Sequence, residues 1–243
     1  MKRTFLFTTK LMLILLCCST LMAQETKTDS IVYKQDYGFR LGGDIYKLVR
    51  TVVDDDYTGF EINGDYRLTK RWYLAGELGT EDKRTTTDFL DVTTTGSYFK
   101  AGVDYNFYRN WLNMENMLFG GFRVGVSSFK QQLDSFTIYD VNNTLFGQYS
   151  SVVGQEFNGL TAIWVEVLFG MKAEVLNNLY MGLNVQLKGL VSLDEPSNFE
   201  NVYIPGFNKT FDSGRFGVGF GYNISYLIPI FKKDKTVKVI GEE

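Results

Sequence analysis

Large apolar side chains alternate with glycine or polar side chains along most of the chain after residue 36. The stretch Gly214–Ile230 (GRFGVGFGYNISYLIPI) shows the pattern most clearly, because rings and aliphatic groups occupy every second position. A period of two residues is that of a β-strand. The pattern predicts strands at about 37–49, 57–69, 72–80, 94–108, 116–129, 159–176, 179–192 and 214–229.

The connections between these strands alternate in length. Tight links follow the second strand (LTKRW) and the sixth strand (VLNNLY), and a modest one follows the fourth (RNWLNMEN). The connection after the first strand is longer, and those after the third, fifth and seventh are long and polar. If neighbouring strands pair as hairpins, the long connections all leave from one end. This layout predicts an all-β fold, an eight-stranded antiparallel up-and-down transmembrane β-barrel with short periplasmic turns and long extracellular loops.

The polar face of the strands favours a position inside the barrel. Such a small barrel has an interior only wide enough for side chains to fill, so small residues help there. The glycines on this face are Gly42, Gly59, Gly79, Gly102, Gly121, Gly125, Gly170, Gly182, Gly217, Gly219 and Gly221. Charges of both signs share the face, and buried charges must pair. They are Arg40, Asp44, Glu61, Asp65, Arg67, Glu77, Lys100, Asp104, Arg123, Glu166, Lys172 and Lys188.

Aromatic residues gather where the strands meet the short turns. Membrane barrels carry an interfacial girdle of aromatic residues at this position. The residues are Tyr66, Trp72, Tyr73, Phe107, Tyr108, Trp111, Tyr180 and Tyr226. We therefore expect rings and aliphatic side chains to face lipid. A soluble, lipocalin-like barrel with the two faces reversed is the alternative that the same alternation allows.

The first residues have the pattern of a secretory signal peptide. A basic start precedes the apolar core Leu11–Cys18 and the small-residue exit Ser19–Ala23. The core is shorter than the roughly 20 residues that span a bilayer, which disfavours a transmembrane anchor. Lipidation at Cys17 or Cys18 is disfavoured because two leucines precede them. We expect a signal peptide at 1–23, a polar leader at 24–36, the barrel at 37–230 and a periplasmic Lys-rich tail at 231–243.

Composition removes several classes of chemistry. Both cysteines lie in the expected signal peptide and the chain has no histidine, which excludes disulfides, thiolate catalysis and cysteine-ligated metals in the rest. Loss of the three basic residues of the signal peptide changes the formal net charge from −3 to −6. An acidic exported chain without a basic cluster is a poor nucleic-acid binder. Acyl-transfer catalysis would need a carboxylate or lysine base, and Asp104 with Lys100 or Glu166 with Lys172 could be imagined in that role. We favour ion pairs that stabilise the barrel as the role of these residues.

Two connections and the tail carry further candidates. Asp54–Asp56, together with Glu81 and Asp82, is a candidate site for Ca²⁺ or for a cation bridge to lipopolysaccharide, although it lacks the spacing of a calcium loop. Phe136–Tyr149 (FTIYDVNNTLFGQY) is either a recognition loop or, as we favour, a hairpin extension of the barrel. The lysines of the tail form either a contact for anionic groups or a solvated terminus.

Three stretches carry a resemblance to a known family. GFEINGDYRLTKRWYLAGELG, KAGVDYNFYRNWLNMENMLFGG and NFENVYIPGFN followed by FGVGFGYNISYLIPIFKK resemble an uncharacterised family of small outer-membrane barrels of Gram-negative bacteria, a domain of unknown function. The resemblance covers about Tyr37 to Lys233 and implies location and architecture without any assigned chemistry. The architecture is also similar to OmpA and OmpX barrels. The chain departs from these by continuing past Phe231, so its insertion signal is expected to be internal, around Gly219–Tyr226.

The sequence thus predicts a monomeric, non-enzymatic outer-membrane barrel with a lumen filled by side chains. Its expected role is envelope structure or recognition by surface loops, with no catalytic, cofactor-binding or metal-ligating residues. Its expected partners are outer-membrane lipid, lipopolysaccharide and the barrel-assembly machinery, and nucleic acid is excluded. A small-solute pore and a soluble periplasmic ligand binder are the alternative functions.

Overall fold

A computed structural model describes the chain over residues 29–108, 115–138, 149–197, 199–209 and 215–239. Residues 35–233 form one compact unit, which contains the barrel. The segments on either side form a second unit, in which residues 29–34 and 235–239 lie in strands. Strand structure therefore enters the expected leader and the expected tail, so these ends are more regular than predicted. The expected signal peptide lies outside the described residues.

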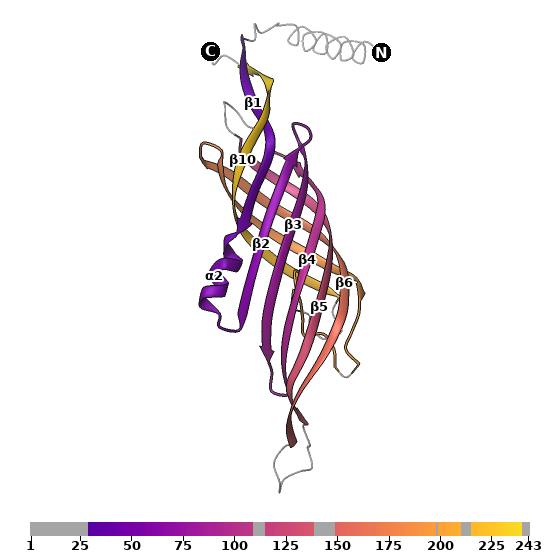
Figure 1. Cartoon of the computed structure of the whole chain (residues 1–243). Coiled ribbons are helices and arrows are strands. Elements are labelled where there is room, and N and C mark those ends of the chain that lie inside the picture. Colours follow the sequence, from indigo (N-terminus) through magenta and orange to yellow (C-terminus); the bar gives the residue numbers. More distant parts are fainter. Residues whose placement is uncertain (1–28, 109–114, 139–148, 198, 210–214, 240–243) are drawn as a thin grey trace, which may run out of the picture. The chain divides into compact units, whose positions relative to one another are not determined.

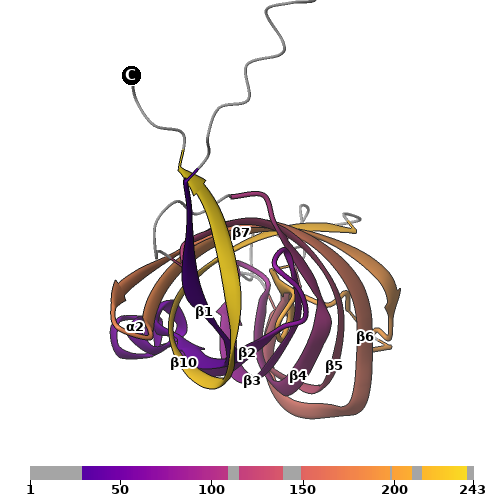
Figure 2. The same cartoon turned by 90° about the horizontal axis from the view of Figure 1, so that it is seen from above.

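Eight long strands close into an antiparallel barrel, in which each strand pairs with its neighbours in the chain (Figures 1 and 2). The ring order is β1-β10-β7-β6-β5-β4-β3-β2, and a small β8-β9 hairpin is separate from it. The long strands are β1 (Asp29–Asp44), β2 (Tyr57–Arg67), β3 (Trp72–Thr86), β4 (Leu90–Asn106), β5 (Met117–Ile138), β6 (Tyr149–Leu176), β7 (Leu179–Leu193) and β10 (Phe216–Val239). The predicted fold class is confirmed, and most strand bounds are close to those predicted.

The prediction of strand over residues 45–49 is wrong, because the chain there is helical. Helix α2 spans Ile45–Val53, and Asp44 caps it by accepting a hydrogen bond from the Tyr46 backbone N–H at 2.8 Å. Its apolar residues are spaced as a helical stripe rather than as a strand. They are Ile45, Leu48, Val49, Val52 and Val53. No helix among the described residues is long and apolar enough to cross a membrane.

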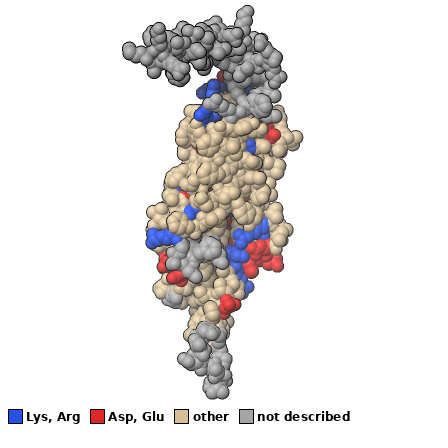
Figure 3. Space-filling view, turned by 180° about the vertical axis from the view of Figure 1, so that it is seen from behind, with Lys and Arg blue, Asp and Glu red and all other residues tan. Residues whose placement is uncertain are grey.

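The outer face of the barrel is apolar, and the inner face carries the charges. On β10, Phe216, Val218 and Phe220 are 80%, 67% and 51% exposed, whereas Lys100 of β4 and Glu166 of β6, on the inner face, are 1% and 0% exposed. Figure 3 shows a broad surface without Lys, Arg, Asp or Glu on the middle of the barrel, with charged residues gathered near its ends. Such an apolar band is typical of the lipid-facing surface of a membrane-spanning barrel. The reversed, lipocalin-like alternative is therefore wrong.

Glycines of the inner face make room for the largest lumenal side chains. A Cβ atom on Gly125 would lie 2.3 Å from the Trp164 ring, and a Cβ atom on Gly79 would lie 2.3 Å from the Tyr98 hydroxyl oxygen. Trp164 and Tyr98 are buried inside the barrel. The predicted function of the inward glycines, to let a narrow interior pack, is confirmed at these positions.

Gly125→Ala is expected to destabilise the barrel by about 1–3 kcal/mol, because the added methyl group overpacks the lumen against Trp164. Gly189→Ala is the matched control, since the nearest atoms to its added Cβ lie at an ordinary 3.9 Å. Urea titration of both variants refolded into lipid vesicles measures the difference. Equal free energies of unfolding would contradict a tightly packed lumen at Gly125.

The predicted aromatic girdle is confirmed for some residues and wrong for others. Trp72, Phe107, Tyr108 and Tyr226 are exposed on the outer face. Tyr66 is half-buried, and Trp111 lies outside the described residues. Tyr73 and Tyr180 instead point into the lumen, where the Arg40 guanidinium lies over both rings at 4.9 and 5.1 Å. A buried cation attracts ring faces, which explains why these two tyrosines turn inward.

Candidate functional site

The lumen is filled by ion pairs in its middle. The Lys100 ammonium lies 2.8 Å from a Glu77 carboxylate oxygen and 3.7 Å from one of Glu166. Arg123 pairs with Asp104 at 2.8 Å and approaches Glu77 at 3.5 Å. These side chains come from β3, β4, β5 and β6, so the network links four consecutive strands of the wall through the interior. All the charges predicted for the inner face are buried or nearly so.

A second cluster fills the lumen toward the short-turn end. Asp65 accepts from two bases, the Arg40 guanidinium at 2.7 Å and the Lys172 ammonium at 2.6 Å. Arg67 pairs with Glu115 at 2.8 Å nearby. The two pairs considered for catalysis, and disfavoured, do not form, because Asp104 pairs with Arg123 instead of Lys100 and Lys172 pairs with Asp65 instead of Glu166. The carboxylates of these candidate pairs are engaged in ion pairs of the barrel interior.

Glu81 is the point where the helix, the strands and the last long connection meet. Its Oε1 atom accepts from the Lys47 ammonium at 2.6 Å and from the Tyr57 hydroxyl at 3.1 Å. Its Oε2 atom accepts from the Tyr203 hydroxyl at 2.7 Å and from the Gly206 backbone N–H at 2.9 Å. Glu81 is 1% exposed, so this carboxylate is fully desolvated and fully hydrogen bonded.

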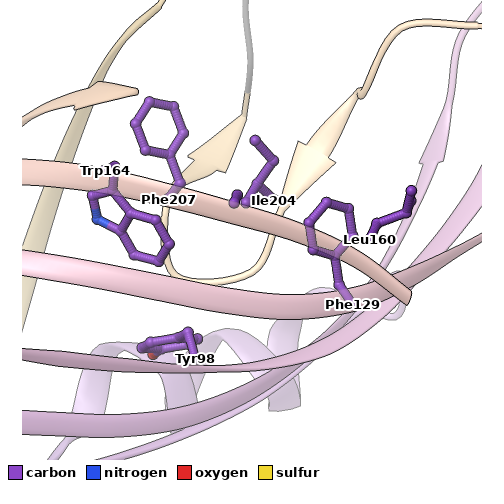
Figure 4. Close-up of a cluster of buried hydrophobic side chains, with 7 residues drawn as sticks. Tyr98, Phe129, Leu160, Trp164, Ile204 and Phe207 are labelled. Atoms are coloured by element: carbon purple, nitrogen blue, oxygen red, sulfur yellow. The ribbon is translucent and has the colours of Figure 1, made fainter. Parts of the chain in front are cut away.

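The connection after β7 folds back into the mouth of the barrel as a plug, which we define as residues 203–209. It contains the short strands β8 (Tyr203–Ile204) and β9 (Asn208–Lys209). Figure 4 shows Ile204 and Phe207 of the plug within a cluster of wall side chains, and Phe207 meets Trp164 edge to face at 6.0 Å between ring centroids. Gly206 has φ +79°, and a Cβ atom there would lie 2.5 Å from the Tyr98 ring.

Sequence reasoning missed this plug. The connection was expected to be an extracellular loop because it is long and contains Pro205, which lies in the buried stretch YIPGF at 203–207. The available signal was the apolar content of that stretch within an otherwise polar connection. A loop exposed to water has no need for an isoleucine and a phenylalanine at 0% exposure.

The charges around Glu81 determine the protonation states of Lys47 and Tyr203, which hydrogen bond to it. Burial lowers the pKa of Lys47, but the facing Glu81 and Glu61 carboxylates more than offset it, so this pKa lies above its usual value. Burial raises the pKa of the Tyr203 phenol well above its usual value, and the Glu81 carboxylate raises it further. Both groups are therefore in the protonated, hydrogen-bond-donating form at neutral pH.

We expect the plug to loosen in alkali. Lys47 and Tyr203 have raised pKa values in the folded state, so their contribution to stability is complete below the unfolded values of about 10 and is lost as the pH rises further. Unfolding free energy measured in vesicles should fall above about pH 10. Tyr203→Phe should show a shallower fall, and an unchanged slope in that variant would contradict this account of Tyr203.

The acidic cluster considered, and disfavoured, as a cation site is dispersed. Asp54 accepts from Lys83 at 3.2 Å and from Arg50 at 3.1 Å, whereas Glu81 points into the lumen. Partial burial raises the pKa of Asp54, but the two hydrogen bonds lower it more, so it lies below its usual value. Asp82 accepts from the Thr95 hydroxyl at 2.6 Å. Within the described part of the chain, no group of three possible ligands is brought together.

β5 and β6 continue as a paired ladder, the β5-β6 extension, well beyond the point where β7 leaves β6, with β4 alongside β5 as far as Phe136. Their ladder runs to Ile138 opposite Tyr149, while β6 pairs with β7 only from Ala162 onward. Tyr149 and Val152 of this extension are 63% and 87% exposed. The hairpin interpretation of Phe136–Tyr149 is thus confirmed at its two ends, and residues 139–148 lie outside the described residues.

Comparison with known proteins gives a family and a similar solved structure. A family described as a domain of unknown function (DUF6048) matches residues 3–233. No curated protein matches the sequence. The crystal structure of Ail, the attachment invasion locus protein of Yersinia pestis, matches at 13% identity with a TM-score of 0.37, covering 83% of this chain and 99% of that chain.

Proposed function

Since the chain belongs to the DUF6048 family, whose function is unknown, we propose from its geometry that it is a non-enzymatic outer-membrane barrel with a closed lumen. The observation that supports a closed lumen is that two sets of side chains, the ion pairs and the plug, fill the interior. Ion pairs fill the middle of the lumen and reach across it from Lys172 to Asp65, and the plug packs into its other end. An eight-stranded barrel filled in this way leaves no aqueous path for solutes.

The long connections lie outside the cell in this proposal, and the short turns and both termini lie in the periplasm, as in other barrels of this type. The rigid barrel then carries the β5-β6 extension away from the membrane. One edge of β6, over residues 149–161, has no strand partner in the described part of the chain, and it exposes apolar side chains such as Val152. Open strand edges recognise other chains by β-augmentation. We assign recognition to this extension.

Recordings across planar phosphatidylcholine bilayers test the closed lumen. The purified full chain should give no reproducible conductance steps. A variant with the plug replaced by a Gly-Ser linker and with Lys100→Ala serves as the control in which conductance should increase. Large, reproducible steps from the unaltered protein would overturn the closed barrel and favour a small-solute pore.

A hairpin-trimmed variant tests recognition separately. Joining Gln132 to Glu156, which pair across the ladder, through an Asn-Gly turn removes the extension together with the β5 partners of β4 residues 90–92. Cells displaying the full chain should bind immobilised vesicles made from the same outer membrane, and cells displaying the trimmed variant should not. Equal binding by both would leave the barrel with a structural role only.

A further inference from the structure

The wall of the barrel is interrupted between β2 and β10. β1 pairs with β2 only as far as Gly43 opposite Ile62, although β2 continues to Tyr57. On the other side, the carboxylate of Asp44, the last residue of β1, accepts from the Tyr222 backbone N–H at 3.4 Å. Residues 216–221 of β10 therefore run past the end of β1.

Helix α2 stands where the missing strand would be, at the perimeter of the barrel beside β2 (Figures 1 and 2). Toward β2, the Thr51 hydroxyl accepts from the Gly59 backbone N–H at 2.9 Å. Toward β10, the ring of Tyr46 packs on Phe220 at 4.6 Å between centroids. In the described part of the chain, no strand pairs with this edge of β10 over residues 216–221. A sheet edge left open toward lipid is costly unless something covers it.

A cavity of about 400 Å³ lies at this interruption. Its lining combines lumenal groups, Lys100, Gln186 and Lys188, with the lipid-facing Val218 and Phe220 of β10. The cavity thus joins the polar interior of the barrel to its apolar outer surface. Its volume falls within the range of small-molecule sites.

The charge of the lining favours an anion. The acidic side chains in the lining are Asp44, Asp56 and Glu61, and Glu61 is held by the Lys47 ammonium at 2.9 Å. The basic side chains of the lining are Lys47, Arg50, Lys83, Arg84, Lys100 and Lys188, and all but Lys188 have a carboxylate oxygen within 3.2 Å. Lys188 hydrogen bonds the Gly206 carbonyl oxygen at 2.7 Å, while the Glu166 carboxylate stays 3.6 Å away. Its ammonium therefore keeps donor capacity on the cavity side.

We propose that this cavity binds a single-chain amphiphile with an acidic head group, of the fatty-acid class. The carboxylate meets Lys188 inside the lumen, and the acyl chain leaves between α2 and β10, along Val218 and Phe220, into the surrounding bilayer. The exposed apolar residues of α2, with Val52 and Val53 at 82% and 77%, place the helix at the same lipid boundary. The site goes beyond the proposed recognition role and is independent of it.

Photolabelling of the full chain in phosphatidylcholine nanodiscs tests the site. The probe is a 12-carbon fatty acid that carries a diazirine on its chain, and peptide mass spectrometry locates the labels. Labels should concentrate on Tyr46, Val218 and Phe220, at least tenfold above Val185 and Phe169 elsewhere on the outer face. An even distribution around the barrel would mean ordinary lipid contact and would overturn the proposal.

Lys188→Met should reduce labelling by the fatty-acid probe at least tenfold. A probe with the same chain and an alcohol in place of the carboxylate should label the unaltered protein as weakly as the fatty-acid probe labels Lys188→Met. Lys172→Met removes a lumenal ammonium outside this cavity and should leave labelling unchanged. Gly219→Leu is a second variant, since a Cβ atom there lies 3.1 Å from the Lys188 Nζ atom and a longer side chain fills the cavity. Undiminished labelling in either folded Lys188→Met or folded Gly219→Leu, or strong labelling by the alcohol, would overturn the proposal.

Discussion

Asp65→Ala is expected to reduce the free energy of unfolding by about 3–5 kcal/mol, because it leaves the buried Arg40 and Lys172 without their shared carboxylate. Neither base has another acidic partner within 4.0 Å among the described residues. A charge stranded in a desolvated interior costs far more than the ion pair itself contributes. Guanidinium titration of protein refolded into vesicles measures the loss.

Glu156→Ala is the matched control for Asp65→Ala. Glu156 also pairs with a lysine, Lys130, but at 3.8 Å and with both side chains 47% exposed. Exposed pairs contribute about 0–1 kcal/mol, so this variant should unfold like the unaltered protein. Similar losses for the two variants would mean that water reaches Asp65 and that the lumen is not closed.

Val185→Arg tests the opposite face and is expected to cost about 2–4 kcal/mol, the range for arginine near the bilayer midplane of a membrane barrel. Val185 is 54% exposed at the middle of the apolar run of β7, and the register places it between Phe169 and Phe220. Moving a guanidinium into hydrocarbon requires snorkelling or thinning of the bilayer. The same vesicle titration applies.

Val152→Arg introduces the same change on the β5-β6 extension, where the side chain is 87% exposed. Because this position lies beyond the apolar band in the proposed arrangement, the expected change is within about 0.5 kcal/mol. A large cost at both positions, or at neither, would contradict the assignment of lipid contact to the band alone.

Much of the barrel could be predicted because the two faces of each strand meet different environments. The alternation of side chains along a strand therefore indicates which face points outward. Phe216, Val218 and Phe220 alternate with glycines, and the structure exposes the former as predicted. The helix was misassigned for a physical reason as well. Residues 45–53 satisfy a helical stripe, but the strand that precedes them supplies no break other than the Asp44 cap.

The sequence predicts which residues fill the lumen but not which of them pair with one another. Which residues face inward follows from the period of two, whereas the partner of Asp104 depends on the register between β4 and β5, which sets Gly102 opposite Arg123. The position of Glu81 as a common acceptor needed the plug to fold back, and no local pattern encodes that long-range contact. The interruption between β2 and β10 likewise depends on where β1 ends relative to both neighbours.

The central claim is that the apolar face contacts acyl chains while the charged face fills the interior. Spin labels at single cysteines test it directly, and residues 24–243 contain no native cysteine. In vesicles, labels at Leu183, Val185 and Leu187 should be relaxed strongly by oxygen and weakly by a water-soluble nickel chelate. A label at Val152 should show the reverse. Nickel access at Val185 equal to that at Val152 would contradict the account.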